Sequence, residues 1–224
     1  ATADEPPLVR LQAGFAATTI AEHFRDQGAD VLLMMDSITR LARAQREVGL
    51  AIGEMPASRG YPPSVYEMIP GLVERVGPSV RGTITGIYSV LVEGDDMLEP
   101  VADTVRATLD GHINLSRQLA QRGQYPAVDV TASVSRLMEK VVDERHIADA
   151  QTCRRLLAGH REIADLLAVG AYEPGGDAWT DAAVHLAGDV RHLLAQGLEE
   201  NSEFSQGRAE LARIARRARE MVNG

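Results

Sequence analysis

The stretch VLLMMDSITR, from Val31 to Arg40, places five apolar residues directly before a carboxylate. An apolar run this short, preceded by a Gly-Ala-Asp turn and followed by polar residues, is typical of a strand buried on both faces of a parallel sheet. Asp36 then lies at the carboxyl end of the strand, the edge of an open α/β sheet where ligands bind. The stretch therefore predicts an α/β fold.

Asp36 has two interpretations at this position. An aspartate at the end of such a strand holds Mg²⁺ through its water shell in nucleoside triphosphatases. Alternatively, its carboxylate caps the following helix, because aspartate accepts hydrogen bonds from free helical N–H groups. In that case Asp36 could also pair with Arg40, one helical turn on. Spacing alone leaves both interpretations open.

The chain around this stretch alternates between helical and strand patterns. Apolar spacing and turn residues predict helices over residues 11–27, ended by Gly28, over 37–49, ended by Gly49, over 64–76, capped by Ser64, and over 100–109. Strands are predicted over residues 31–35, 82–94 and 112–116, and a helical turn over 117–121. This alternation is typical of an α/β unit.

The pattern changes near Val142. From Asp143 onward no strand is predicted, and apolar residues from Ile147 to Leu167 indicate one long amphipathic helix ended by Gly170. Two further helices follow, the first ending at Leu194. We therefore expect two domains, an α/β core over residues 1–142 and a helical domain over 143–224.

Composition narrows the functional classes. The formal net charge of −9 over 224 residues argues against a nucleic-acid binder, because such proteins need a basic face. The single cysteine, Cys153, excludes an internal disulfide; it lies in a predicted helix and is expected to serve packing. No apolar segment is long enough to span a bilayer, so we expect a cytoplasmic protein. The first ten residues, ATADEPPLVR, contain no methionine, and we expect the natural amino terminus to lie upstream.

Three other segments carry side chains suited to chemistry. The tetrad EGDD, from Glu93 to Asp96, follows the second predicted strand and could hold a magnesium ion or form a solvated turn. Tyr125, in YPAVD, could stack on a flat heterocycle or pack in the core. Arg136, in SVSR, could form a surface ion pair or reach the phosphates of a neighbouring subunit's nucleotide. The six histidines show no metal-ligand spacing and are expected to be structural or at the surface.

Taken in order, these segments resemble a known family. The residues DSITRLARAQREVGLAIGEMPASRGYPPSVYEMIPGLVERVG, VLVEGDDMLEPVADTVRATLDGHINLSRQLA and YPAVDVTASVSRLM are similar to the catalytic ATPase of type III protein secretion. This group includes the injectisome and flagellar export motors and is related to the catalytic subunit of rotary ATP synthases. The segments VLLMMDS, ARAQRE and EPVADTVR resemble the injectisome branch more than the flagellar one. The implied fold is part of a RecA-like core followed by an all-helical domain.

The resemblance implies roles for the matching residues. Asp36 corresponds to the acidic residue that ends the family's Walker B strand and coordinates Mg²⁺ through water. Arg40 would organise charges near the catalytic pocket. Tyr125 corresponds to the aromatic residue that packs on adenine, and Arg136 to the arginine finger that reaches into the next subunit.

The implied role of the acidic tetrad is less specific. Glu93 and Asp95 match a loop near the active site and are candidates for binding the nucleotide. The family's phosphate-binding loop is not in this sequence, since no G-x-x-x-x-G-K-[ST] occurs. We therefore expect the carboxyl-terminal half of the enzyme, inactive by itself.

The implied function is ATP hydrolysis with Mg²⁺ in a homo-hexameric ring that releases and unfolds export substrates. The implied partners are export chaperone–substrate complexes, a central stalk and peripheral stator proteins, at the cytoplasmic face of the bacterial inner membrane. A non-catalytic ring or assembly subunit stays open, because the phosphate-binding loop that would decide is not present. A dehydrogenase is disfavoured, because the sequence has no G-x-G-x-x-G.

Overall fold

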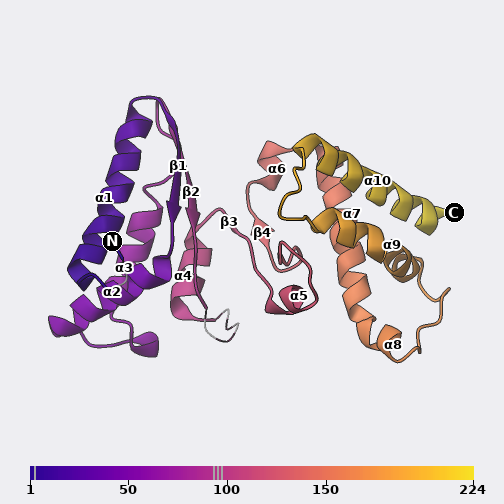
Figure 1. Cartoon of the computed structure of the whole chain (residues 1–224), viewed down its shortest axis with the longest axis horizontal. Coiled ribbons are helices and arrows are strands. Elements are labelled where there is room, and N and C mark those ends of the chain that lie inside the picture. Colours follow the sequence, from indigo (N-terminus) through magenta and orange to yellow (C-terminus); the bar gives the residue numbers. More distant parts are fainter. Residues whose placement is uncertain (3, 93, 95, 97) are drawn as a thin grey trace. The chain divides into compact units, whose positions relative to one another are not determined.

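The computed structural model of the chain describes residues 1–2, 4–92, 94, 96 and 98–224. It consists of two compact units, residues 1–109 and residues 110–224 (Figure 1). The first unit contains α1 (Pro7–Asp26), β1 (Asp30–Met35), α2 (Ile38–Ala51), the 3₁₀ turn η1 (Ser58–Gly60), α3 (Pro63–Val73), β2 (Thr83–Tyr88) and α4 (Pro100–Thr108). The second contains β3 (Gly111–His112), α5 (Arg117–Gln121), β4 (Val134–Ser135), α6 (Met138–Val141), α7 (Glu144–Glu162), α8 (Ala164–Ala168), α9 (Ala178–Leu194) and α10 (Phe204–Asn223).

The first unit is built on a parallel pair of strands. Strands β1 and β2 run in register from Asp30 opposite Thr83 to Met35 opposite Tyr88, although about fifty residues separate them in sequence. Helices α2 and α3 make the crossover between them, as parallel pairing requires. The α/β prediction is confirmed in this unit.

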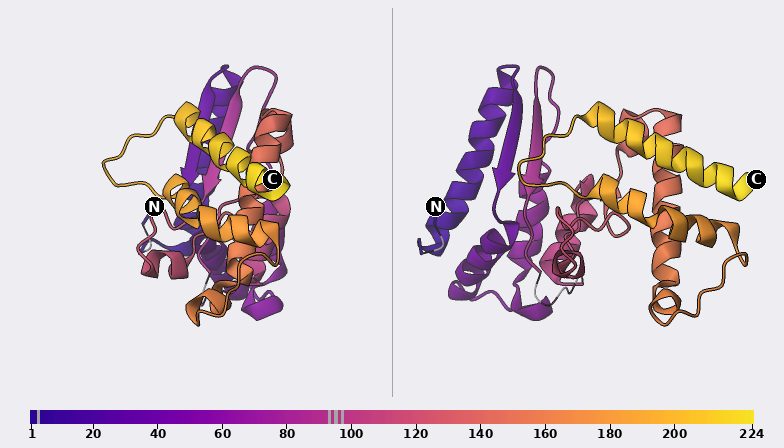
Figure 2. Two further views of the ribbon diagram at one scale, coloured as in Figure 1. Left: turned by 90° about the vertical axis from the view of Figure 1, so that its right-hand side faces the viewer. Right: turned by 45° about the vertical axis from the view of Figure 1, so that its right-hand side comes forward.

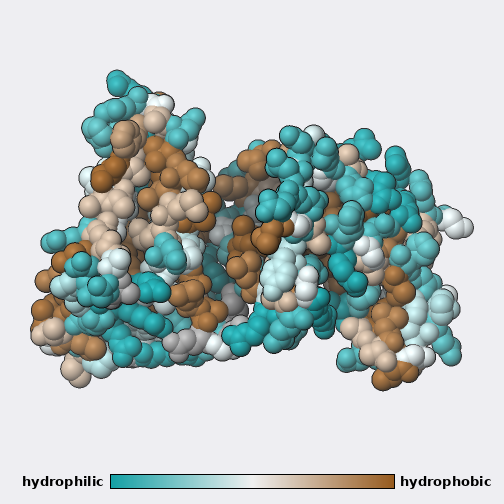
Figure 3. Space-filling model, in the orientation of Figure 1, coloured by the Kyte–Doolittle hydropathy of each residue, from teal (hydrophilic) through white to brown (hydrophobic). Residues whose placement is uncertain are grey.

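One face of this sheet is covered and the other is not. Leu33 and Ile84 are buried under α1, together with Ala21 of that helix. On the opposite face Leu32 is 59% exposed and Met34 69% exposed, and hydrophobic surface lies over this part of the unit (Figure 3). The expectation that β1 is buried on both faces is therefore wrong for the described residues, because helices cover only one side.

Most of the first unit's core lies among the helices that follow β1. Fully buried side chains from α2, α3 and α4 meet there: Ile38, Val65, Ile69, Leu72 and Val101. Each such side chain contributes about 1.5–3 kcal/mol relative to an exposed position. This packing fixes the first turn of α2, which follows Asp36.

Two predicted helix ends in this unit are wrong, the stop at Gly49 and the cap at Ser64. Helix α2 continues past Gly49 to Ala51. Gly49 lies within the helix, where its lack of a side chain leaves room for Pro62: a Cβ there would approach Pro62 Cγ to 2.8 Å. Helix α3 begins at Pro63, a residue with φ preset for a first turn, so Ser64 is not its cap.

Strand β2 is shorter than predicted. It ends at Tyr88. The carbonyl of the next residue, Ser89, accepts a hydrogen bond from Ile38 N at the start of α2. The predicted strand over residues 112–116 is likewise reduced to β3, with one isolated bridge from Leu115 to Val128.

The second unit is mainly helical. Helices α9 and α10 lie side by side, and each packs on α7 (Figure 2). Their shared core includes Leu156, Leu186 and Ile214. Cys153 lies in this core, as expected, and burial raises the pKa of its thiol to about 11. The predicted long helix over 147–167 is interrupted at Ile163, which separates α7 from α8.

In the described part of the chain, no helix is both long and apolar enough to cross a membrane.

Glycine at position 82 is a steric requirement. A Cβ on Gly82 would clash with the carbonyl oxygens of Arg25, in the last turn of α1, and of Ala29, between α1 and β1. We expect Gly82→Ala to lower the free energy of unfolding by about 1–3 kcal/mol, because the backbone must shift. Gly71→Ala is the matched control: its Cβ meets nothing within 4 Å in α3, and we expect a gain of about 0.5–1 kcal/mol. Urea unfolding followed by circular dichroism measures both variants, and equal effects would contradict the steric requirement for glycine at position 82.

Candidate functional site

Asp36 lies directly after β1 and is exposed. Its carboxylate accepts a hydrogen bond from the Ser89 hydroxyl, with an oxygen–oxygen distance of 2.6 Å. Ser89 itself follows the last residue of β2. Asp36 therefore lies at the carboxyl edge of two paired parallel strands, the position that the sequence predicts.

The helix-capping interpretation of Asp36 is wrong. Ser37 caps α2, and its hydroxyl oxygen accepts a hydrogen bond from the Arg40 N–H group at 3.3 Å. Between the described side chains of Asp36 and Arg40 there is no ion pair. Arg40 is exposed on the first turn of α2. The Asp36 carboxylate consequently keeps oxygen lone pairs that face solvent.

Sequence reasoning missed two residues that hold this edge together. The Ser89 backbone donates to Met35 O and accepts from Ile38 N, both at 3.0 Å, so it links the end of β1 to the start of α2. Thr39 is 2% exposed, and its hydroxyl accepts from Leu91 N at 2.8 Å and donates to Leu91 O at 3.3 Å. These bonds anchor the segment that leads into the acidic tetrad.

The acidic tetrad is only partly described. Glu93 and Asp95 lie outside the described residues, so both of their interpretations stay open. Asp96 forms an ion pair with Arg59 at 2.6 Å, and this hydrogen bond holds the pKa of the Asp96 carboxyl below its ordinary value. Among the described residues, no three histidine, cysteine or acidic side chains are grouped as metal ligands.

Tyr125 precedes Pro126 in the second unit, in the loop after α5. It is 58% exposed, so the interpretation as a core tyrosine is wrong. Its backbone carbonyl accepts a hydrogen bond from Gln196 N at 2.8 Å, which ties the loop to the segment after α9. The ring is thus presented at the surface by a fixed backbone.

Asp129 organises the segment between Tyr125 and Arg136. One carboxylate oxygen accepts from Thr131 N at 3.0 Å, Thr131 Oγ1 at 2.9 Å and Ala132 N at 3.1 Å, and also pairs with Arg161 at 2.9 Å. Burial works to raise the pKa of Asp129, but the hydrogen bonds from Arg161 and Thr131 hold it below its ordinary value. The sequence offered no signal for this role, because Arg161 is 32 residues away.

Arg136 follows β4 directly and is exposed. Its backbone N–H donates to Asp110 O at 2.8 Å, and β4 pairs antiparallel with β3 through Gly111 and His112. Asp36 and Arg40 belong to the first unit, and Tyr125 and Arg136 to the second. The geometry of each pair is defined within its own unit.

A carboxylate at the carboxyl edge of parallel strands, in an α/β unit whose chain continues into a helical unit, fits a nucleotide-binding protein, because ligands bind at this edge of α/β sheets. The nucleotide-binding domain model of the ATP synthase alpha/beta family matches residues 1–135, and the model of the T3SS EscN ATPase C-terminal domain matches residues 142–213. The chain belongs to the ATP synthase alpha/beta family. The predicted resemblance and fold class are confirmed.

Two groups of relatives are similar to the chain. A flagellum-specific ATP synthase of Pseudomonas aeruginosa is 51% identical over 214 residues, which are 95% of this chain and 48% of the relative. A type 3 secretion system ATPase of Pseudomonas savastanoi pv. phaseolicola is 51% identical over 200 residues, which are 89% of this chain and 44% of the relative. The chain spans about half the length of the curated relatives it matches.

Solved structures of EscN are also similar. The assembled ATPase EscN from the enteropathogenic E. coli type III secretion system matches with a TM-score of 0.93 and 44% identity, over 96% of this chain and 52% of that one. EscN in complex with its central stalk EscO matches with a TM-score of 0.88 and 43% identity, over 96% of this chain and 51% of that one. The compact units divide at residues 109 and 110, so the domain boundary at 142 and 143 stays a prediction.

Thr39 allows a test of how the edge is held. We expect Thr39→Val to lower the free energy of unfolding by about 1–3 kcal/mol, because both backbone groups of Leu91 lose a buried partner. Thr104→Val is the control: its hydroxyl donates to Pro100 O inside α4, where the carbonyl keeps its helical bond. Its expected cost is below about 1 kcal/mol. Urea unfolding by circular dichroism measures both, and equal costs would contradict the anchoring role.

Asp129 predicts a pH dependence. Because the pKa of Asp129 is depressed in the folded state, its carboxylate stabilises the fold at pH values above its ordinary pKa of about 3.8. This contribution is lost as the pH falls through the pKa of the folded state. We expect Asp129→Asn to cost about 2 kcal/mol at pH 7, and the difference from the parent to shrink below about pH 4. Denaturant unfolding across this pH range measures the difference. The exposed Asp165→Asn is the control, and a pH-independent difference for Asp129→Asn would contradict the assignment.

Proposed function

We propose that this chain is part of the ATP-hydrolysing motor of type III protein secretion, which releases and unfolds export substrates. The observation that carries the proposal is the exposed Asp36 carboxylate at the carboxyl edge of β1 and β2, in a chain of the ATP synthase alpha/beta family. The similarity to type 3 secretion and flagellar ATPases supports the same activity.

Asp36 is the proposed anchor for Mg²⁺. The donor set fits this ion, because Mg²⁺ is bound in such sites through one or two carboxylates, water and substrate phosphates rather than by an all-protein cage. Asp36 presents one carboxylate toward solvent, oriented by Ser89. Arg40 would balance phosphate charge from the first turn of α2, with Glu93 and Asp95 as further candidates near the nucleotide. When bound, Mg²⁺ would neutralise charge on the phosphates of ATP.

Tyr125 and Arg136 are the proposed contributions of the second unit. An exposed aromatic ring on a fixed loop suits stacking on adenine. The permanent charge of Arg136 suits stabilisation of the phosphates at transfer, donated to a neighbouring subunit. An arginine lent to a neighbour requires a closed ring, and we propose a homo-hexamer. The similar protein EscN has been solved as an assembled ATPase, which supports assembly here.

The proposed partners follow from the family resemblance. They are export chaperone–substrate complexes, peripheral stator proteins and a central stalk, the last supported by the solved complex of EscN with EscO. We propose a cytoplasmic protein, associated peripherally with the secretion apparatus at the inner membrane. The net charge of −9 supports the absence of nucleic acid from this set.

A flagellar export ATPase is the second candidate. The flagellum-specific relative and the type 3 secretion relative are both 51% identical to the chain, so identity does not favour either branch. The nucleotide chemistry proposed for Asp36, Tyr125 and Arg136 is the same in both.

Arg136→Ala tests the activity. In an ATPase of full family length that contains this chain, we expect the substitution to lower the turnover number about a thousandfold or more, while nucleotide binding is retained. Steady-state phosphate release measures turnover, and fluorescent ADP titration measures binding.

Arg117→Ala is the matched control, because Arg117 is exposed on α5 in the same unit and has no proposed role. It should leave turnover unchanged. Near-normal turnover in Arg136→Ala would refute the arginine-finger role. A parent protein that assembles but has no turnover would favour a non-catalytic ring subunit.

A further inference from the structure

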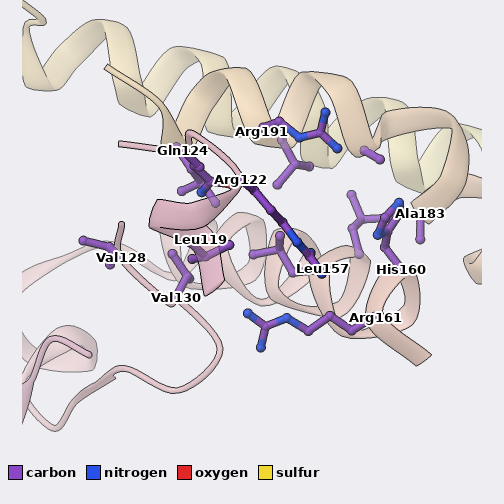
Figure 4. Close-up of a pocket in the computed structure, with 14 residues that line it drawn as sticks. Leu119, Arg122, Gln124, Val128, Val130, Leu157, His160, Arg161, Ala183 and Arg191 are labelled. Atoms are coloured by element: carbon purple, nitrogen blue, oxygen red, sulfur yellow. The ribbon is translucent and has the colours of Figure 1, made fainter. Parts of the chain in front are cut away.

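The second unit contains a cavity of about 320 Å³. It lies between α5 with the segment after it on one side and helices α7 and α9 on the other (Figure 4). This volume is at the lower end of the range for small-molecule sites. Asp36, Arg40, Tyr125 and Arg136 do not line it.

The lining combines an apolar wall with basic side chains. Aliphatic residues from all sides form the wall, namely Leu119, Val128, Val130, Leu156, Leu157, Ala183, Ala187, Val190 and Leu194. Arg122, His160, Arg161 and Arg191 add the basic groups, and Gln124 adds an amide (Figure 4). The described lining contains no carboxylate, although the chain as a whole carries a net charge of −9.

Two of these basic groups lack a counter-charge. Arg161 is neutralised by Asp129, with which it pairs at 2.9 Å. Arg122 and Arg191 form no ion pair with any residue that the structure describes. Burial lowers the pKa of His160, and the charges of Arg191 and Arg122 lower it further, so both guanidinium groups act on one imidazole. Both arginines line the cavity and are exposed, so an anion that enters the cavity can reach them from solvent and offset their positive charge.

We propose that this cavity binds a small amphiphilic carboxylate, whose headgroup is held by Arg122 and Arg191 and whose hydrocarbon body lies on the leucine and valine wall. Guanidinium groups form paired, charge-assisted hydrogen bonds with carboxylates. Removing the hydrocarbon body from water adds affinity in proportion to the apolar area buried. The site would make the second unit responsive to an anion that is not a nucleotide.

Octanoate is a suitable probe, because 1-octanol and acetate supply its tail and its headgroup separately. In isothermal titration calorimetry of the 224-residue chain, octanoate should bind at one site and about tenfold or more tightly than either fragment. Arg122→Ala and Arg191→Ala should each weaken octanoate about tenfold, because each removes a charge-assisted contact. Arg154→Ala, an exposed arginine of α7 outside the cavity, should leave the affinity unchanged.

Two further variants locate the binding. Ala187→Phe should fill part of the cavity and abolish octanoate binding while circular dichroism stays unchanged. Met34→Lys, on the exposed face of the β1–β2 sheet, should have no effect. The proposal is overturned if octanoate does not bind, if octanol binds equally well, if both arginine variants keep the parent affinity, or if Met34→Lys abolishes binding.

Discussion

The parallel pairing of β1 with β2 is the constraint on which the first unit depends. It brings together segments that lie about fifty residues apart, and it sets Met35 opposite Tyr88 at the end of the ladder. Ser89 then bonds to both β1 and α2, and its hydroxyl orients Asp36. A register shift of one residue would turn Leu33 and Ile84 away from α1, so the core and the candidate site require the same register.

Local sequence patterns were enough to predict the position of Asp36 but not its surroundings. A short apolar run before a carboxylate marks a strand end, and the family resemblance adds a role for the carboxylate. Ser89 and Thr39 had no such signal, because their contacts cross the whole β1–β2 connection. Burial on both faces was predicted from the short apolar run Val31–Met35, yet exposure also depends on what covers a sheet, and the described chain covers one face only.

In the second unit, the candidate side chains could be predicted from the sequence, but the contacts that hold their loop could not. YPAVD and SVSR marked Tyr125 and Arg136 through resemblance to a family. Asp129, between the two, holds four donors, and one of them comes from α7. Helix ends were predicted best where a glycine with positive φ follows, as at Gly28, and worst where packing decides, as at Gly49.

The single tryptophan of the chain has a practical consequence. Trp179 packs against the α7–α9–α10 core, with the Arg155 guanidinium 3.9 Å from its ring centroid. Its fluorescence therefore reports on the second unit alone, because the first unit contains no tryptophan. Circular dichroism records both units at once. Unfolding curves from fluorescence and from circular dichroism that do not coincide would show that the two units unfold independently.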